Sequence, residues 1–293
     1  MDEVAEVNRI AEAAEAVDNA SPLDEAGRMA LADGTATVLL RPGGFALVHD
    51  GDLSLAVHPD HRGRGVGTAL LQETSYDGAL TAWSHGNHPA AARLAVSHGW
   101  DRVRDLWVMR RSAAGPLPPL EPPAGVEIRS YRDSDAPAIV AVNAAAFAHH
   151  PEQGAMDEDN LARRMAEPWF DPAGLLVAED GSGVLGFHWT KQHDVGHGEV
   201  YVVGVAPGAQ GRGLGRLLTL AGLHHLARLG VEEVLLYVES DNMPAVALYS
   251  RLGFEHAESD THVQYRRRAS AYSGGDVPAQ LPVSGTPSGH LPA

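Results

Sequence analysis

A pattern that occurs twice limits the fold of this chain more than any other feature. The stretch LAVHPDHRGRGVGTALL at residues 55–71 aligns without a gap to VGVAPGAQGRGLGRLLT at residues 203–219, an offset of 148 residues. Farther along, NHPAAARLAVSHGW at 87–100 aligns to NMPAVALYSRLGF at 242–254 once one insertion is allowed. Two copies of one plan at so long an interval indicate two tandem domains of similar fold.

The sequence divides into four parts. Its 293 residues are enough for two domains of ordinary size, each with its own core. Between the copies, five prolines within residues 113–125 indicate a stiff, exposed linker. We therefore predict an N-terminal domain at 1–112 and a C-terminal domain at 126–266. Residues 267–293 lack apolar periodicity, which predicts a disordered tail.

Composition excludes several classes of protein. A formal net charge of −16 opposes non-specific binding to nucleic acid or to anionic membranes. No apolar run approaches the roughly 18 residues of a membrane span, and the acidic N-terminus is unlike a signal peptide. The absence of cysteine rules out disulfides and fits a reducing cytoplasm. We expect a cytoplasmic monomer that binds neither nucleic acid nor membrane.

The second copy has the element order of an α+β fold with a mixed, mostly antiparallel sheet. The pattern predicts a strand at 126–131, a helix at 135–148, a hairpin at 174–192, a strand at 198–207, a helix at 213–230 that Gly230 ends, a strand at 233–240, a helix at 244–253 and a last strand or hairpin at 254–268. Regular strand–helix alternation, as in a doubly wound fold, is absent from this pattern.

The glycine-rich loop before the long helix indicates an anion site. Free N–H groups at a helix N-terminus bind phosphates, and Arg212 and Arg216 add positive charge. A nucleotide P-loop requires a Gly-Lys pair, which the chain lacks, and a dinucleotide fingerprint requires a different glycine spacing. A purely structural turn remains the alternative for this loop.

Two motifs together resemble the GCN5-related N-acetyltransferase (GNAT) family. They are Q-x-x-G-x-G after a strand, from Gln210, and N-x-x-A-x-x-x-Y-x-x-x-G-F, from Asn242. The tandem arrangement and the stretches NAAAFAHHPEQG, LGFHWTK, GEVYVVGVAP and LYVESDN resemble, more narrowly, the mycothiol synthase family of actinobacteria, up to about residue 266. That family transfers acetyl from acetyl-CoA to the cysteinyl amine of desacetylmycothiol. We expect no metal, because the histidines of the chain lack the helical setting of common zinc motifs.

The resemblance assigns acetyl-CoA to the strand and glycine loop of each copy and to the start of the last helix. The implied residues are Leu55, Ala56, Val57, Arg62, Gly63, Arg64, Gly65, Val66 and Gly67 in the first copy, and Val203, Gly204, Val205, Gln210, Gly211, Arg212, Gly213, Leu214, Gly215, Arg216, Asn242, Met243, Pro244, Ala245, Val246 and Ala247 in the second. Without a ligand, the expected role of Asn242 is to cap its helix.

Two residues of the second copy are candidates for the chemistry. Acetyl transfer to an amine requires a neutral nucleophile and an acid for the departing thiolate. Glu199 begins the strand that leads into the glycine loop, and the resemblance makes it the base. Tyr249 shares a helix face with Asn242 and Ala245, and the resemblance makes it the acid. An ordinary strand-end Glu and a core Tyr are the alternatives.

For the acceptor, the resemblance implies a set of polar residues. They are Asp18, Glu152, Lys191, Glu199 and Tyr237. Carboxylates and an ammonium suit a ligand with many hydroxyls because each forms charge-assisted hydrogen bonds. Lys191 is also the only lysine in the chain, in a sequence that otherwise uses Arg.

Other interpretations were weighed against this one. His188, His193, His197 and Glu199 can be drawn as a metal cluster, but they lack the helical spacing of common zinc motifs. The first copy has Gly51 where Glu199 stands, and Leu94 or Ala95 where Tyr249 stands, so it is expected to bind CoA or to be structural. The rival functions are an acetyltransferase for another small amine or a protein N-terminus, and a non-catalytic acyl-CoA sensor.

Overall fold

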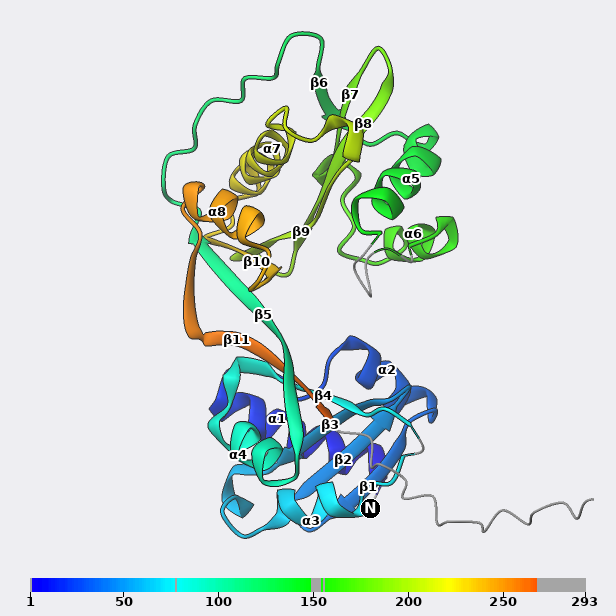
Figure 1. Ribbon diagram of the computed structural model, residues 1–293, viewed down its shortest axis with the longest axis vertical. Coiled ribbons are helices and arrows are strands. Elements are labelled where there is room, and N and C mark those ends of the chain that lie inside the picture. The colour runs from blue at the N-terminus through cyan, green and yellow to red at the C-terminus, as the bar shows by residue number, and fades with distance from the viewer. Residues whose placement is uncertain (1, 77, 149–153, 155, 268–293) are drawn as a thin grey trace, which may run out of the picture.

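The computed structural model describes residues 2–76, 78–148, 154 and 156–267, and these form two lobes joined by two long strands (Figure 1). The N-terminal lobe contains α1 (Glu3–Asp18), α2 (Glu25–Asp33), β1 (Thr37–Arg41), β2 (Gly44–His49), β3 (Asp52–Val57), α3 (Val66–Glu73), β4 (Thr81–Ser84), α4 (Pro89–Ser97) and the first part of β5 (Trp100–Ser112). The expected α+β fold with a mixed sheet is confirmed.

The C-terminal lobe repeats this plan. It contains β6 (Glu127–Ser130), α5 (Ala136–Ala146), α6 (Glu158–Met165), β7 (Leu175–Asp180), β8 (Gly183–Gln192), β9 (His197–Val205), α7 (Leu214–Leu229), β10 (Glu233–Glu239), α8 (Met243–Arg251) and β11 (Glu255–Arg267). Short 3₁₀ helices lie at Pro59–His61, His85–Asn87, Asp133–Asp135, Pro172–Gly174 and Pro207–Ala209. The predicted hairpin is β7–β8, and α7 ends at Gly230, which has a φ of +81°.

One sheet runs through both lobes, because the two long strands are shared. Its order is β1-β2-β3-β4-β11-β5-β10-β9-β8-β7-β6. Residues 106–112 of β5 pair with β10 of the C-terminal lobe, and residues 263–266 of β11 pair with β4 of the N-terminal lobe. The last element is thus one long strand, β11, with an irregular register. The sheet of each lobe includes part of a strand from the other half of the chain.

In each lobe two neighbouring parallel strands separate after a short paired stretch. Strands β9 and β10 pair only from His197 to Val200, although β9 continues to Val205. Strands β3 and β4 pair only at residues 52–53 and 81–82. Within the described residues, the edge of β9 from 201 to 205 therefore has no paired strand on the β10 side, and its backbone polar groups on that side are left for another partner.

Helices cover both faces of the C-terminal part of the sheet (Figure 1). Helix α7 packs on one face through Leu223 and Leu226, which join a core with Val200 and Val234. On the other face α5 and α6 enclose a core that includes Trp189. The linker between the lobes contacts the C-terminal lobe, because the Pro118 carbonyl accepts a hydrogen bond from His224 of α7.

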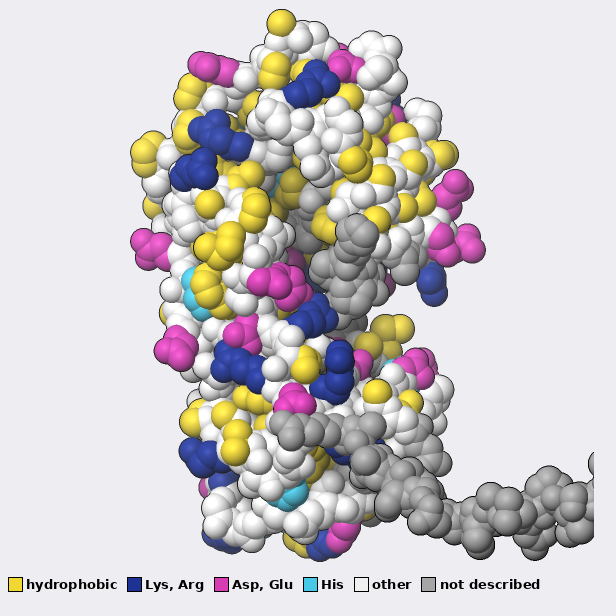
Figure 2. Space-filling view, viewed as in Figure 1, with side chains coloured by type: hydrophobic (Ala, Val, Ile, Leu, Met, Phe, Trp, Pro, Cys, Tyr) yellow, Lys and Arg dark blue, Asp and Glu magenta, His cyan; other side chains and the backbone are white. Residues whose placement is uncertain are grey.

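The surface carries its charge without a single-sign patch on the face seen in Figure 2, where acidic and basic side chains are interspersed over both lobes. Among the described residues, none of the helices has the length and apolar character needed to cross a membrane. Residues 268–293, most of the predicted tail, lie outside the described part, and Arg267 ends β11.

Candidate active site

The three glycines of the second loop serve two different purposes. Gly211 and Gly213 have φ of +78° and +77°, a conformation that other residues adopt only under strain. Gly213 caps α7 without a side-chain hydrogen bond, so within the described residues no side chain caps the first N–H groups of the helix. Gly215 is helical, and a Cβ there would lie 3.5 Å from the Leu248 side chain. The loop thus combines an anion-binding geometry with a close approach of α7 to α8.

The charged and capping residues around this loop have partners of their own. Arg212 forms an ion pair with Asp180 at 3.1 Å, while Arg216 is exposed. The Asn242 side chain accepts a hydrogen bond from the Ala245 N–H at 3.3 Å and so caps α8, as expected without a ligand.

A small cavity of about 200 Å³ lies between β9, α7 and α8. Its walls include Val203, Val205, Gln210, Gly215, Ala245 and Tyr249, all of them residues singled out from the sequence. Burial raises the pKa of the Tyr249 phenol to about 12, so this group stays protonated at neutral pH. Within the described residues its hydroxyl has no hydrogen-bond partner, and its ring rests against Phe254.

Glu199 lies on β9 one residue before the strands separate. Its side chain is only 8% exposed and its Oε2 is 2.7 Å from Nε2 of His193. Across the hairpin it pairs directly with Lys191, and residues paired in this way share a face of the sheet. The sequence pattern offers His193 only as a metal ligand and carries no signal for its contact with Glu199.

The candidate base and acid lie on opposite faces of the sheet. Lys191 and hence Glu199 belong to the face with Trp169, whereas Tyr249 packs with α7 and α8 on the other face. The gap between β9 and β10 connects these two faces. A thioester placed in the gap would present its carbonyl carbon to an amine from one side and its sulfur to a phenol from the other.

The predicted acceptor residues fall into two places. Lys191 Nζ lies 4.6 Å from the centre of the Trp169 ring and 5.4 Å from that of Tyr201, a cation–π arrangement. Tyr237 is 44% exposed and stacks edge-on against His262, and its pKa is raised by burial and then by the charge of Glu199. Glu152 lies outside the described residues.

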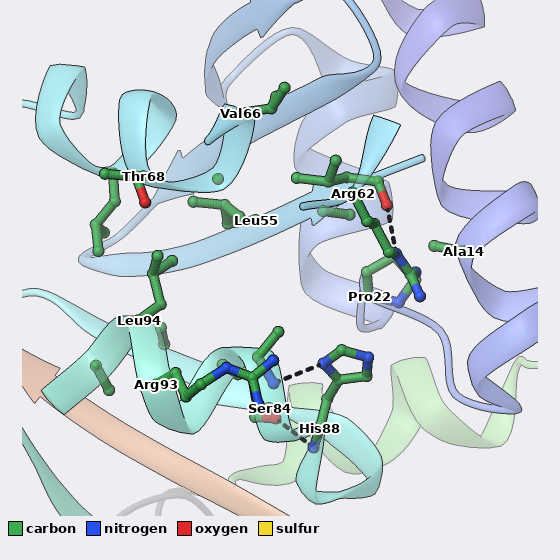
Figure 3. Close-up of a pocket in the computed structure, with 18 of the residues that line it drawn as sticks. Ala14, Pro22, Leu55, Arg62, Val66, Thr68, Ser84, His88, Arg93 and Leu94 are labelled. Carbon is green, nitrogen blue, oxygen red and sulfur yellow. Dashed lines mark hydrogen bonds between the residues drawn. The ribbon is translucent and has the colours of Figure 1, made fainter. Parts of the chain in front are cut away.

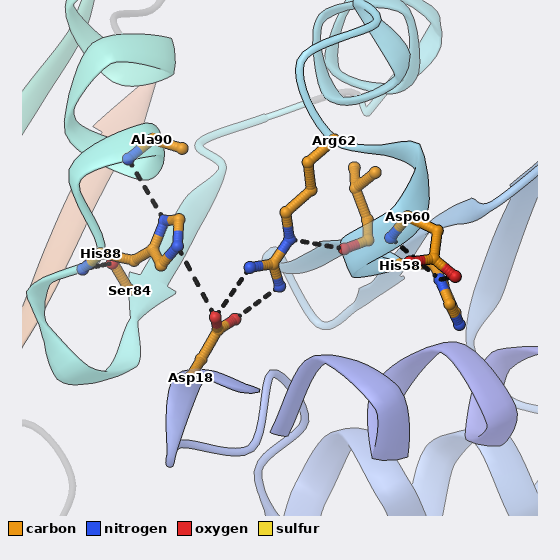
Figure 4. Close-up of polar contacts among 8 residues, drawn as sticks. Asp18, His58, Asp60, Arg62, Ser84, His88 and Ala90 are labelled. Carbon is orange, nitrogen blue, oxygen red and sulfur yellow. Dashed lines mark hydrogen bonds and ion pairs between the residues drawn. The ribbon is translucent and has the colours of Figure 1, made fainter. Parts of the chain in front are cut away.

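Asp18 instead lies in the N-terminal lobe, at the end of α1. Its carboxylate accepts two hydrogen bonds from the Arg62 guanidinium, at 2.8 and 2.7 Å, and lies 3.8 Å from His88 (Figure 4). Arg62 also donates to the Val57 carbonyl. Because 44 residues separate Asp18 from Arg62 in the chain, this pair has no local sequence pattern that predicts it.

A cavity of about 660 Å³, larger than the one beside Tyr249, lies in the N-terminal lobe. It lies between α3 and α4 and is lined by Leu55, Arg62, Val66, Thr68, His88 and Leu94, among others (Figure 3). Gly63 and Gly65 repeat the positive φ of the second loop, at +71° and +81°. Leu94 occupies the wall where the other lobe has Tyr249, so this cavity has space for a ligand without the candidate acid.

Among the described residues, His188, His193, His197 and Glu199 do not form one metal cluster. His188 is fully buried and its Nδ1 donates to the Leu218 carbonyl, and complete burial lowers its pKa to about 4. His193 contacts Glu199, and His197 contacts Asp194. In the part of the chain that the structure describes, no three His, Asp or Glu side chains gather as a metal site.

Comparison with known proteins agrees with this geometry. Residues 25–102 match the acetyltransferase (GNAT) domain and residues 142–254 match the acetyltransferase (GNAT) family. A GCN5-related N-acetyltransferase from Sphaerobacter thermophilus has a similar structure, with a TM-score of 0.67 and 25% identity over 88% of this chain and 90% of that one. The chain is therefore a tandem GNAT acetyltransferase, an enzyme that uses acetyl-CoA.

Closer relatives narrow the class. A mycothiol acetyltransferase from a Nocardioides species is 60% identical over 91% of this chain and 98% of the relative. One from Actinosynnema mirum is 49% identical over 89% of this chain and 94% of the relative. The chain belongs to the mycothiol acetyltransferase family, which confirms the resemblance read from the motifs.

Proposed function

We propose that this enzyme transfers the acetyl group of acetyl-CoA to the cysteinyl amine of desacetylmycothiol, giving mycothiol and CoA. The observation that carries the proposal is the gap between β9 and β10, with Glu199 on one face of the sheet and Tyr249 on the other. The identity of the acceptor is supported by the names of the relatives rather than by a pocket of known shape.

The proposed reaction assigns one proton transfer to each of the two residues. Glu199 accepts a proton from the acceptor ammonium, directly or through water, and the neutral nitrogen attacks the thioester carbonyl. The new C–N bond forms as the C–S bond breaks, and Tyr249 donates its phenolic proton to the departing sulfur. The acetylated nitrogen then loses its extra proton to the Tyr249 phenolate, which restores the phenol. The only proton released per turnover is the one that Glu199 accepted.

The residues around the second glycine loop form a suitable binding site for acetyl-CoA. Its phosphates suit the uncapped N–H groups at the start of α7, and its amide arm suits the edge of β9 near Val203 and Val205 that β10 does not pair. Backbone N–H groups on that edge can polarise the thioester carbonyl. The N-terminal cavity, with the same loop geometry, is proposed either to hold a second CoA or to be structural.

Acceptor recognition is proposed for Lys191, Tyr237 and Glu199 on the Trp169 face, and for Glu152 by its sequence motif. Asp18 is a weaker candidate for free hydrogen bonding because Arg62 already occupies both of its oxygens. We also propose that the enzyme is monomeric and cytoplasmic, which sedimentation of the full chain and cell fractionation test.

The function is tested by mass spectrometry of reactions with acetyl-CoA and desacetylmycothiol. We expect one added acetyl group, located on the cysteinyl nitrogen. Parallel reactions with an aminoglycoside and with a peptide N-terminus provide the matched controls. A higher kcat/KM for either control amine would replace the proposed acceptor, and binding of acetyl-CoA without transfer to any amine would favour the sensor alternative.

A further inference from the structure

The buried carboxylate of Glu199 contacts a histidine that is more exposed than the carboxylate itself. Its side chain is 8% exposed, whereas His193, whose Nε2 lies 2.7 Å from the carboxylate, is 36% exposed. His193 follows the end of β8, and its backbone N–H donates to the His197 carbonyl at 2.9 Å. The hairpin therefore holds the imidazole between the candidate base and bulk water.

The proposed reaction requires such a connection. Each transfer to an ammonium leaves one proton on Glu199, and the base must lose that proton before the next turnover. Burial removes most of the direct contact with water through which an exposed carboxyl group loses its proton, and a bound acceptor would cover the same face. An imidazole can both accept and donate a proton near neutral pH, which an ammonium or a phenol does not do as a rule.

We propose that His193 is the proton exit of the active site, a role that rests on Glu199 being the base as proposed above. Protonated Glu199 donates its proton to Nε2 of the neutral ring that carries hydrogen on Nδ1. The imidazolium then releases the Nδ1 proton to water or buffer. The remaining ring donates its Nε2 hydrogen to the restored carboxylate. A half-turn of the ring then brings its unprotonated nitrogen to Glu199 and the N–H to the exposed side, ready for the next turnover.

A relay makes different demands from a hydrogen bond that only orients Glu199. Orientation affects every turnover, including the first, because the carboxylate must be aimed at the amine from the start. A proton exit affects only later turnovers, because a carboxylate that acts as the base in the first turnover has no proton to lose beforehand. Replacement of His193 by glutamine separates the two roles, since an amide nitrogen can donate to Glu199 in place of Nε2 but cannot carry a proton through.

The experiment compares full-length wild type, His193→Ala, His193→Gln and the matched control His197→Ala in rapid-quench and steady-state assays with acetyl-CoA and desacetylmycothiol. His197 is a suitable control because it lies in the same hairpin but pairs with Asp194. We expect a first turnover near the wild-type rate in both His193 variants, followed by a steady-state rate lower by on the order of 10²-fold in weak buffer, the lower end for a positioned proton-transfer group. Added imidazole should restore His193→Ala toward wild type.

Two results would overturn the relay. One is a first turnover slowed as much as the steady state, which would make His193 an orienting residue only. The other is a steady-state rate in His193→Gln equal to wild type. Failure of the proposed function is distinguishable, because wild type would then form no product in the first turnover, and thermal unfolding of each variant identifies loss of fold.

Discussion

Replacement of Tyr249 by phenylalanine removes the candidate acid with very little other change. The phenol lines the small cavity, and in the described residues no group accepts or donates a hydrogen bond to its hydroxyl. Removing the oxygen therefore leaves no buried polar partner unsatisfied, and the contact between the ring and Phe254 remains. We expect the free energy of unfolding to change by less than about 0.5 kcal/mol, as at sites without such features.

The effect on catalysis should be much larger than the effect on stability. A positioned general acid contributes on the order of 10²–10⁴-fold, which corresponds to about 2.7–5.4 kcal/mol of activation free energy. Because burial raises the pKa of Tyr249 to about 12, the phenol remains protonated through pH 10. Loss of activity caused by its ionisation should therefore begin only above about pH 11, one unit below that pKa.

Steady-state assays at saturating acetyl-CoA and acceptor measure kcat for wild type, Tyr249→Phe and the control Tyr76→Phe, whose phenol is in the N-terminal lobe and 37% exposed. Urea unfolding of the same three proteins measures stability. The assignment of Tyr249 as the acid is refuted if its phenylalanine variant keeps kcat within about threefold of wild type, a loss below 0.7 kcal/mol.

Three further predictions concern the acceptor, the loop and the buried histidine. Lys191→Ala should raise the KM for the acceptor by about 10- to 100-fold, as loss of a charged hydrogen bond of about 1.5–3 kcal/mol implies, and Lys191→Arg should have an intermediate KM. A change only in the KM for acetyl-CoA would instead place Lys191 on that ligand. Gly213→Val, strained at a φ of +77°, should raise the KM for acetyl-CoA, whereas the matched Gly65→Val should leave this KM unchanged. If calorimetry showed normal CoA affinity in Gly213→Val, the loop would be a simple turn. Buried His188 has a pKa of about 4 in the folded state, whereas the same histidine in the unfolded chain binds a proton below about pH 6.5. The free energy of unfolding should therefore fall by on the order of 3 kcal/mol as the pH drops from 6.5 to 4. An equally steep fall in His188→Asn would assign the effect to other groups.

Local patterns predicted the local structure well. The Gly211 and Gly213 turn, the end of α7 at Gly230 and the Asn242 cap each depend on residues within a few positions of one another. The hairpin β7–β8 is equally local. For such features the backbone preference of glycine or the reach of a short side chain is decisive, and both are properties of the residue itself.

Contacts between distant parts of the chain were not predictable in this way. The pairing of β5 with β10 and of β11 with β4 joins the two lobes, and alternating hydrophobicity identifies a strand but not its partner. The Arg62–Asp18 ion pair spans 44 residues. The contact of His193 with Glu199 is closer in sequence but depends on how the hairpin turns, which the residues between them do not specify.

The two shared strands give a structural reason for the lobe with the candidate catalytic residues to require the N-terminal lobe. Without residues 106–112 of β5, strand β10 would lose its antiparallel partner and become an exposed sheet edge, which is prone to non-native pairing. Tyr237 of β10 also packs against His262 of β11, whose ring nitrogen lies 3.1 Å from that of His85 in the N-terminal lobe. The position of a proposed acceptor residue therefore depends on the packing of both lobes. The N-terminal lobe need not perform chemistry to be required for it, since it supplies the strand and the side chains that hold β10 in place.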